Sequence, residues 1–146
     1  NVAGAGWPDL ADTAVANLVP IVFAAIRANK NPVVFGDDYD TPDGSCVRDY
    51  VHVLDLAEAH LSALDYLDFD VRPHDTFNVG TGQGSSVFEV LAEIKAVSGI
   101  DFDTDVLERR AGDPPFLAAD VSRIEKTLGW KAKKNLHDII ESAWNA

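Results

Sequence analysis

The chain has little of several features that define other classes of protein. Its single cysteine, Cys46, has no partner for an internal disulfide, and no Cys/His spacing resembles a zinc site. No apolar run approaches the roughly 18 to 20 residues that a membrane-spanning helix needs, and no basic segment precedes an apolar stretch at the start. We therefore expect a cytoplasmic protein with no membrane partner. Methionine is absent from all 146 residues and the first residue is Asn1, so we also expect a piece of a longer protein.

Positive charge is scarce as well. The chain has 12 Lys and Arg against 24 Asp and Glu, a formal net charge of -12. Because nucleic-acid binding depends on a concentrated basic surface, we expect no nucleic-acid partner. Against this acidic background Arg48, Arg109 and Arg110 stand out. These guanidinium groups either bind one small anion or form ordinary surface ion pairs, and the pattern alone leaves both interpretations open.

Apolar residues are plentiful, at 47% of the chain, which is enough for the core of one globular domain. Helical periodicity and capping residues predict five helices: 17–30, 55–67, a helix after Ser86 that ends at Gly99, one near 122–129, and 136–144. Short apolar runs predict strands at 32–35, 76–79 and 102–107. This alternation indicates an α/β protein with an incomplete Rossmann-type parallel sheet, because so few strands accompany five helices.

A glycine-rich loop follows the strand expected at 76–79. Gly80, Gly82 and Gly84 open a helix, as in a dinucleotide-binding loop. The spacing differs from the dinucleotide fingerprint, however, because Ser85 occupies the place of the third glycine of that pattern. A tight turn between strand and helix is therefore the favoured interpretation.

Two further groups of residues suggest sites but fit poorly. Four aspartates precede Gly44: Asp37, Asp38, Asp40 and Asp43. Their spacing resembles a calcium loop, but Pro42 falls at a ligand position and Gly44 comes one residue late, so a solvated turn is favoured. Cys46 and His52 have the chemistry of a thiolate–imidazole pair, although nothing in the sequence places them in contact. We expect no metal site.

The motifs that carry a family resemblance come in a fixed order. Residues 34–60 read VFGDDYDTPDGSCVRDYVHVLDLAEAH, preceded by NVAGA at 1–5 and followed by FNVGTG at 77–82, RRAGDP at 109–114 and LGW at 128–130. Over essentially its whole length the chain resembles UDP-glucose 4-epimerases of the extended short-chain dehydrogenase family. The resemblance implies that residues 1–146 are the carboxy-terminal nucleotide-sugar-binding region, with Rossmann-type elements and the small substrate domain but without the amino-terminal NAD-binding region.

The resemblance also implies a reaction, the interconversion of UDP-glucose and UDP-galactose by NAD-mediated oxidation and reduction at C4 of the sugar. The family's Gly-x-x-Gly-x-x-Gly loop and Tyr-x-x-x-Lys pair do not occur in this sequence. We therefore expect no catalytic and no cofactor-binding residue here, NAD only in a full-length parent, and no activity of this chain alone. Another NAD-dependent sugar-nucleotide epimerase or dehydratase, or a stand-alone UDP-sugar-binding module, remain alternatives.

Carried over by position, the resemblance predicts residues that bind the phosphates and ribose. Arg48 and Arg110 match the diphosphate clamp, where a guanidinium forks to phosphate oxygens. Asp113 matches the acceptor for ribose hydroxyls. Asn17 and Leu18 begin a helix whose backbone N–H groups are expected to face the phosphates, with a simple helix cap as the alternative.

The remaining predicted residues surround the base and the sugar. Val33 and Phe35 match the strand that lines the uracil pocket, and Asn1 and Tyr50 are expected near the sugar-phosphate end. Leu117 matches the residue that limits space around the hexose, and a leucine there leaves plain hexose or N-acetylhexosamine open. The expected partner is a UDP-hexose. The parent is expected to be a homodimer, and this chain alone to self-associate or swap through unpaired strand edges.

Overall fold

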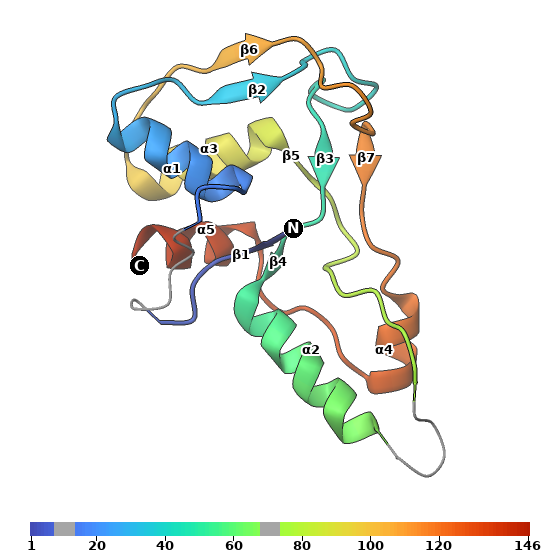
Figure 1. The fold of residues 1–146 in the computed structure, drawn as a ribbon. Coiled ribbons are helices and arrows are strands. Elements are labelled where there is room, and N and C mark those ends of the chain that lie inside the picture. Colours follow the sequence, from blue (N-terminus) through green and yellow to red (C-terminus); the bar gives the residue numbers. More distant parts are fainter. Residues whose placement is uncertain (8–13, 68–73) are drawn as a thin grey trace.

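A computed structural model describes residues 1–7, 14–67 and 74–146 (Figure 1). In chain order the elements are β1 (Val2–Ala3), α1 (Leu18–Arg27), β2 (Val33–Phe35), β3 (Val47–Arg48), β4 (Val51–His52), α2 (Val53–Tyr66), β5 (Ser85–Ser86), α3 (Val87–Ser98), β6 (Asp105–Leu107), β7 (Phe116–Leu117), α4 (Ser122–Leu128) and α5 (Leu136–Trp144). Among these described helices, none combines the length and apolar character needed to cross a bilayer.

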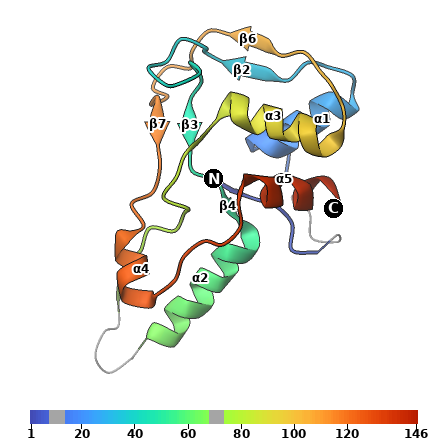
Figure 2. The same cartoon turned by 180° about the vertical axis from the view of Figure 1, so that it is seen from behind.

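The strands form three small sheets. β1 pairs with β4 and β2 pairs with β6, both in parallel, while β3 lies between antiparallel β5 and parallel β7. In Figure 1 and Figure 2, α1, α3 and α5 lie at the β2–β6 end of the molecule, and α2 and α4 lie at the other end. The strands β3 and β7 run side by side between the two ends. The expected α/β class, with small parallel sheets and five helices among the described residues, is confirmed.

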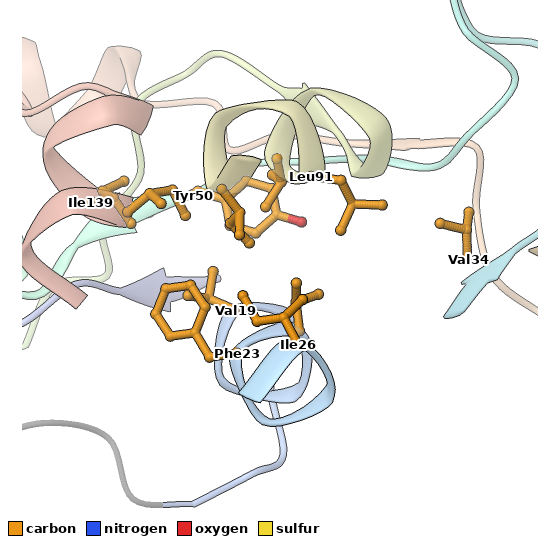
Figure 3. Close-up of a cluster of buried hydrophobic side chains, with 11 residues drawn as sticks. Val19, Phe23, Ile26, Val34, Tyr50, Leu91 and Ile139 are labelled. Carbon is orange, nitrogen blue, oxygen red and sulfur yellow. The ribbon is translucent and has the colours of Figure 1, made fainter. Parts of the chain in front are cut away.

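The main core lies between three helices. Val19, Phe23 and Ile26 on one face of α1 point toward α3 and α5, where Leu91 and Ile139 meet them (Figure 3). Ile94 and Ile140 are fully buried in the same cluster. Burying each such side chain stabilises the fold by about 1.5 to 3 kcal/mol, so the three helices form a rigid support for the strands beside them. A second cluster joins β4, α2 and α4 through Val51, Ala59, Ile124 and Trp130.

Local hydrogen bonds explain where two of the helices begin. The Ser86 hydroxyl accepts the Glu89 N–H at 3.0 Å, and the Glu89 carboxylate accepts the Ser86 N–H at 2.7 Å, so the predicted capping box before α3 is confirmed. Asn135 and Asp138 form the same reciprocal arrangement before α5. Both helices therefore start where the sequence indicates.

Other element boundaries differ from the expectation. No strand forms at residues 76–79, because no segment that the structure describes pairs with them, and a strand exists only with a partner. The first helix is shorter than expected because Asn29 turns the chain with φ of 52°. α2 begins two residues earlier than expected, at Val53, because His52 caps it.

His52 joins three segments at the start of α2. Its Nδ1 accepts the Leu54 N–H at 3.1 Å, so the ring proton is on Nε2, 2.9 Å from the Ser142 hydroxyl oxygen. That oxygen also accepts the Ala5 N–H at 3.1 Å, and its hydroxyl donates to the Ile139 carbonyl at 3.1 Å. The neutral imidazole thus links α2, α5 and the segment after β1.

We predict that acid weakens the fold through His52. Burial, helped by the positive charge of Lys134, lowers the pKa of His52 below its usual 6.5, against an opposing effect of Asp55 and Asp138. The unfolded chain then binds more protons than the folded chain just below pH 6.5, so stability falls as the pH drops from that value toward the folded pKa. Urea unfolding at about pH 7.5 and about pH 5.5 measures this loss.

The variant His52→Asn keeps a helix-capping acceptor but does not titrate, so its stability is expected to change less between the two pH values. His137 serves as the contrast, because its hydrogen bond with Glu93 raises the pKa of His137 and its contribution has the opposite sign. An unchanged pH dependence in His52→Asn would contradict the assignment.

Candidate functional site

A cavity of about 220 Å³ lies where α1, β2 and β3 meet the chain after β6. Nine of the ten residues predicted to contact a ligand line it: Asn1, Asn17, Leu18, Val33, Phe35, Arg48, Tyr50, Arg110 and Asp113. We call it the nucleotide cavity. The tenth, Leu117, lines a neighbouring cavity of about 640 Å³, the sugar cavity, which shares Asn1 and Arg48 with the first. The nucleotide cavity therefore brings together residues that are up to 112 positions apart, and their roles in binding stay predictions.

The segment around β3 faces both cavities. Cys46, Arg48 and Tyr50, at alternate positions, line the nucleotide cavity, as expected when successive side chains of an extended segment point to opposite sides. Asp49 and Val51 line the sugar cavity instead. Sequence reasoning missed Cys46 as a cavity residue, although the same alternation around Arg48 indicates it. Ala16, Val34 and Val87 also line the nucleotide cavity and were not predicted.

Arg48 is held firmly at the boundary of the two cavities. Its Nη1 donates to the carbonyl oxygens of Val47 and Pro114, both at 2.8 Å, and its Nη2 lies 3.4 Å from the Asp113 carboxylate. The side chain is 17% exposed. These contacts fix the guanidinium without neutralising it completely, since most of its partners are neutral carbonyls. It is therefore a preorganised cation at the cavity wall.

The neighbouring residues Arg109 and Arg110 have different environments. Arg109 lies over the Tyr39 ring, and its Nε forms an ion pair with the Asp38 carboxylate at 2.5 Å. The hydrogen bond from Arg109 lowers the pKa of Asp38 below its usual 3.8. Arg110 instead stacks on Phe35, with its guanidinium carbon 3.8 Å from the ring centroid, and lines the nucleotide cavity. Only the second arginine is placed to meet an anion there.

Tyr50 supplies a proton donor at the inner wall of the nucleotide cavity. The side chain is 7% exposed and lies between α1 and α3 (Figure 3). Burial raises the pKa of Tyr50 to about 12, with Arg48 opposing the shift. The phenol therefore keeps its proton at neutral pH and offers a hydroxyl rather than a negative charge to an anionic ligand.

Two backbone amides of the glycine-rich loop bind a carboxylate of the same chain. The N–H groups of Thr81 and Gly82 donate to the two carboxylate oxygens of Asp49 at 2.9 and 3.1 Å. Because these amides already bind a carboxylate of the chain, they do not form an open phosphate cradle. The dinucleotide interpretation of this loop is therefore not supported, and the tight-turn interpretation fits the contacts.

Two of the four aspartates before Gly44, Asp38 and Asp43, form side-chain contacts within the chain. Asp43 accepts the Ser45 N–H at 2.9 Å and the hydroxyl groups of Ser45 and Ser86. Burial alone would raise the pKa of Asp43, but hydrogen bonds from Ser86 and Ser45 outweigh it and lower the pKa below its usual 3.8. Among residues 1–7, 14–67 and 74–146, no three His, Cys, Asp or Glu side chains are grouped to hold a metal ion.

The considered pair of Cys46 and His52 does not form. Cys46 lines the nucleotide cavity, whereas both ring nitrogens of His52 have other partners, Leu54 and Ser142. His52 lies six positions after Cys46, on β4, where its Nε2 faces Ser142 of α5. A thiolate–imidazole mechanism is therefore excluded for these two residues.

Comparison with known proteins places this geometry in a family. The profile described as GDP-mannose 4,6 dehydratase matches residues 8–143. A UDP-glucose 4-epimerase from Halalkalibacterium halodurans is 42% identical over 131 residues, which cover 88% of this chain and 39% of that protein. The chain thus spans about 39% of the length of this relative. The resemblance to UDP-glucose 4-epimerases drawn from the motifs is confirmed.

Two solved structures have closely similar folds. A UDP-glucose 4-epimerase from Stenotrophomonas maltophila, with bound NAD and formylated UDP-arabinopyranose, superposes with a TM-score of 0.89 at 38% identity, covering 99% of this chain and 44% of the other. A UDP-glucose 4-epimerase from Bifidobacterium longum, in complex with NAD⁺ and UDP, superposes with a TM-score of 0.86 at 38% identity, again covering 99% of this chain and 44% of the other. The described fold is therefore that of a large part of these enzymes.

Proposed function

We propose that this chain, which belongs to the GDP-mannose 4,6-dehydratase family, is the carboxy-terminal, UDP-sugar-binding part of an NAD-dependent UDP-glucose 4-epimerase. The observation that carries the proposal is the convergence of Arg48 and Arg110 on one cavity of an acidic chain. Two guanidinium groups beside an aromatic side chain and a helix amino terminus suit a nucleoside diphosphate. The two similar enzymes have formylated UDP-arabinopyranose and UDP bound in their structures.

In the proposed complex both arginines bind the diphosphate. Arg48 is fixed by carbonyl groups, and Arg110 is supported by Phe35, so little side-chain freedom is lost when the anion binds. The start of α1 at Asn17 and Leu18 adds backbone N–H groups and the positive end of the helix dipole. Binding of the nucleotide then holds the substrate while the sugar is free to present either face.

The ends of the ligand are assigned to the two cavities. Val33 and Phe35 lie beside the proposed base, and the Asp113 carboxylate is proposed to accept ribose hydroxyl groups. The sugar extends past Asn1 into the sugar cavity, whose wall includes Leu117. Leucine is smaller than an aromatic residue and leaves both a hexose and an N-acetylhexosamine as candidates.

We propose that the NAD of the complete enzyme is held outside the glycine-rich loop of this chain. The glycine-rich loop that follows residues 76–79 uses its amides on Asp49, so it offers no pyrophosphate cradle. When bound in a complete enzyme of this family, NAD accepts and returns the hydride at C4 of the sugar. The part that this chain plays is to bind and orient the UDP-sugar, and the interconversion of UDP-glucose and UDP-galactose is proposed for the whole enzyme.

The test is calorimetric titration of the purified chain with UDP, with GDP as the matched control. We expect UDP to bind with a micromolar dissociation constant, on the order of -8 kcal/mol, and GDP at least about tenfold more weakly, because the base site proposed beside Val33 and Phe35 is assigned to uracil. Equal binding of the two nucleotides would favour a GDP-sugar dehydratase, in line with the description of the family profile. The absence of any UDP binding by the folded chain would reject the proposal.

A further inference from the structure

Asp49 is a buried carboxylate, 8% exposed, directly between the cavity residues Arg48 and Tyr50. One oxygen accepts the Thr81 N–H at 2.9 Å and the Thr81 hydroxyl at 2.7 Å. The other accepts the Gly82 N–H at 3.1 Å and the Ala119 N–H at 3.2 Å. Four donors from two distant segments thus meet on one side chain, which is the full capacity expected of a carboxylate.

The main chain of the same residue reaches the sugar cavity. The Asp49 N–H donates to the Leu117 carbonyl oxygen at 3.1 Å, in the pairing of β3 with β7. Leu117, Ala119 and Gly80 all line the sugar cavity together with Asp49. Through its main chain and its side chain, Asp49 therefore holds two walls of this cavity at a set distance from Arg48.

The fit around the carboxylate leaves no room for adjustment. A Cβ atom at Gly80 would lie 2.5 Å from the Asp49 Oδ2 and 2.9 Å from the Ala119 Cβ. The loop, the carboxylate and the segment after β7 are therefore in close contact. A small displacement of the carboxylate has to move Gly80 or Ala119, and both are walls of the sugar cavity.

We propose that Asp49 is a positioning residue that sets the width of the sugar cavity and so determines how well the sugar of a UDP-sugar is held. The inference rests on the proposed function, because it assigns the sugar to the cavity that Leu117 lines. It separates two tasks. Arg48 and Arg110 bind the diphosphate, whereas Asp49 acts on the sugar by fixing the positions of the cavity walls around it.

The experiment compares Asp49→Asn with Asp55→Asn. In Asp49→Asn the amide NH₂ faces two of the four donors in either orientation, so one wall is released. Asp55 is the matched control: it is 2% exposed, and one of its oxygens accepts the N–H groups of Lys133 and Lys134 at 3.2 and 3.0 Å, away from both cavities. Both changes remove an acceptor for distant backbone amides, so a purely structural role predicts similar results.

Titration with UDP and with UDP-glucose provides the first measurement. In Asp49→Asn we expect UDP affinity to stay within about twofold and UDP-glucose affinity to fall about fivefold relative to UDP, whereas Asp55→Asn leaves the ratio unchanged. If wild type binds both ligands and the two variants have the same ratio, the positioning role is overturned. If wild type binds neither, the proposed function has failed instead.

Amide hydrogen exchange of the ligand-free chain provides the second measurement, which does not depend on binding. Loss of protection at Thr81, Gly82 and Ala119 in Asp49→Asn, but not in Asp55→Asn, supports the role, and unchanged protection overturns it. If Asp49→Asn fails to fold, Thr81→Val replaces it. This variant keeps the side-chain shape and removes the 2.7 Å hydroxyl contact with Asp49, together with the local contacts of the same hydroxyl with Gln83. The same ratio is therefore expected to change in the same direction by about twofold.

Discussion

Replacing Arg110 by alanine is expected to weaken UDP binding by about 10- to 100-fold, whereas replacing its neighbour Arg109 leaves the affinity within about twofold. A charge-assisted hydrogen bond contributes about 1.5 to 3 kcal/mol, and each 1.4 kcal/mol is about a factor of ten in affinity. Arg110 stacks on Phe35 and lines the nucleotide cavity. Arg109 is engaged by Asp38 and Tyr39 and does not line it.

Comparing Arg109→Ala with Arg110→Ala is a sharper test than Arg48→Ala. Arg48 also bonds the carbonyl groups of Val47 and Pro114, so Arg48→Ala loses structure as well as charge. The two adjacent variants change the net charge equally, and calorimetry with UDP at one salt concentration compares them directly. Equal losses in Arg109→Ala and Arg110→Ala would show that general electrostatic attraction, rather than the stacked guanidinium, binds the phosphates.

Gly44→Ala is expected to lower the free energy of unfolding by about 2 to 5 kcal/mol. Its φ of 82° strains any residue with a side chain by about 1 to 2 kcal/mol, and the new Cβ would lie 1.8 Å from the Asp37 carbonyl oxygen. The carbonyl oxygen is a backbone atom and the Cβ atom is bonded directly to the backbone. The loop itself therefore has to move, at a further cost of about 1 to 3 kcal/mol. That movement breaks the 2.8 Å hydrogen bond from the Tyr39 N–H to the Gly44 carbonyl.

Gly112→Ala separates the two causes. Gly112 has nearly the same φ, 85°, but no atom lies within 4 Å of an added Cβ, so only the conformational strain of about 1 to 2 kcal/mol is expected. Urea unfolding of the two variants and wild type measures the difference. If both substitutions lower the free energy of unfolding by the same amount, the close approach to Asp37 does not constrain the loop in solution.

The candidate site was accessible from the sequence only in part. The family resemblance named nine residues that line one cavity, and the alternation around Arg48 would have added Cys46. The sequence did not show that Arg109 and Arg110 have different environments, because Asp38, the ion-pair partner of Arg109, lies 71 residues away in the chain. Nor did the glycine-rich loop indicate where its amides point, since their acceptor, Asp49, lies 32 residues away from Thr81.

The sequence by itself determined that five helices form and where two of them, α3 and α5, begin, because capping at Ser86 and Asn135 uses hydrogen bonds between residues three positions apart. Only the tertiary structure decided which extended segments become strands. Residues 47–48 pair with 116–117 and 85–86, whereas residues 76–79 find no partner among the described residues. The physical reason is the distance along the chain between the groups that interact. A helix pairs its backbone N–H and C=O groups within its own segment, but a strand, a cavity wall and an ion pair need groups that only folding brings together.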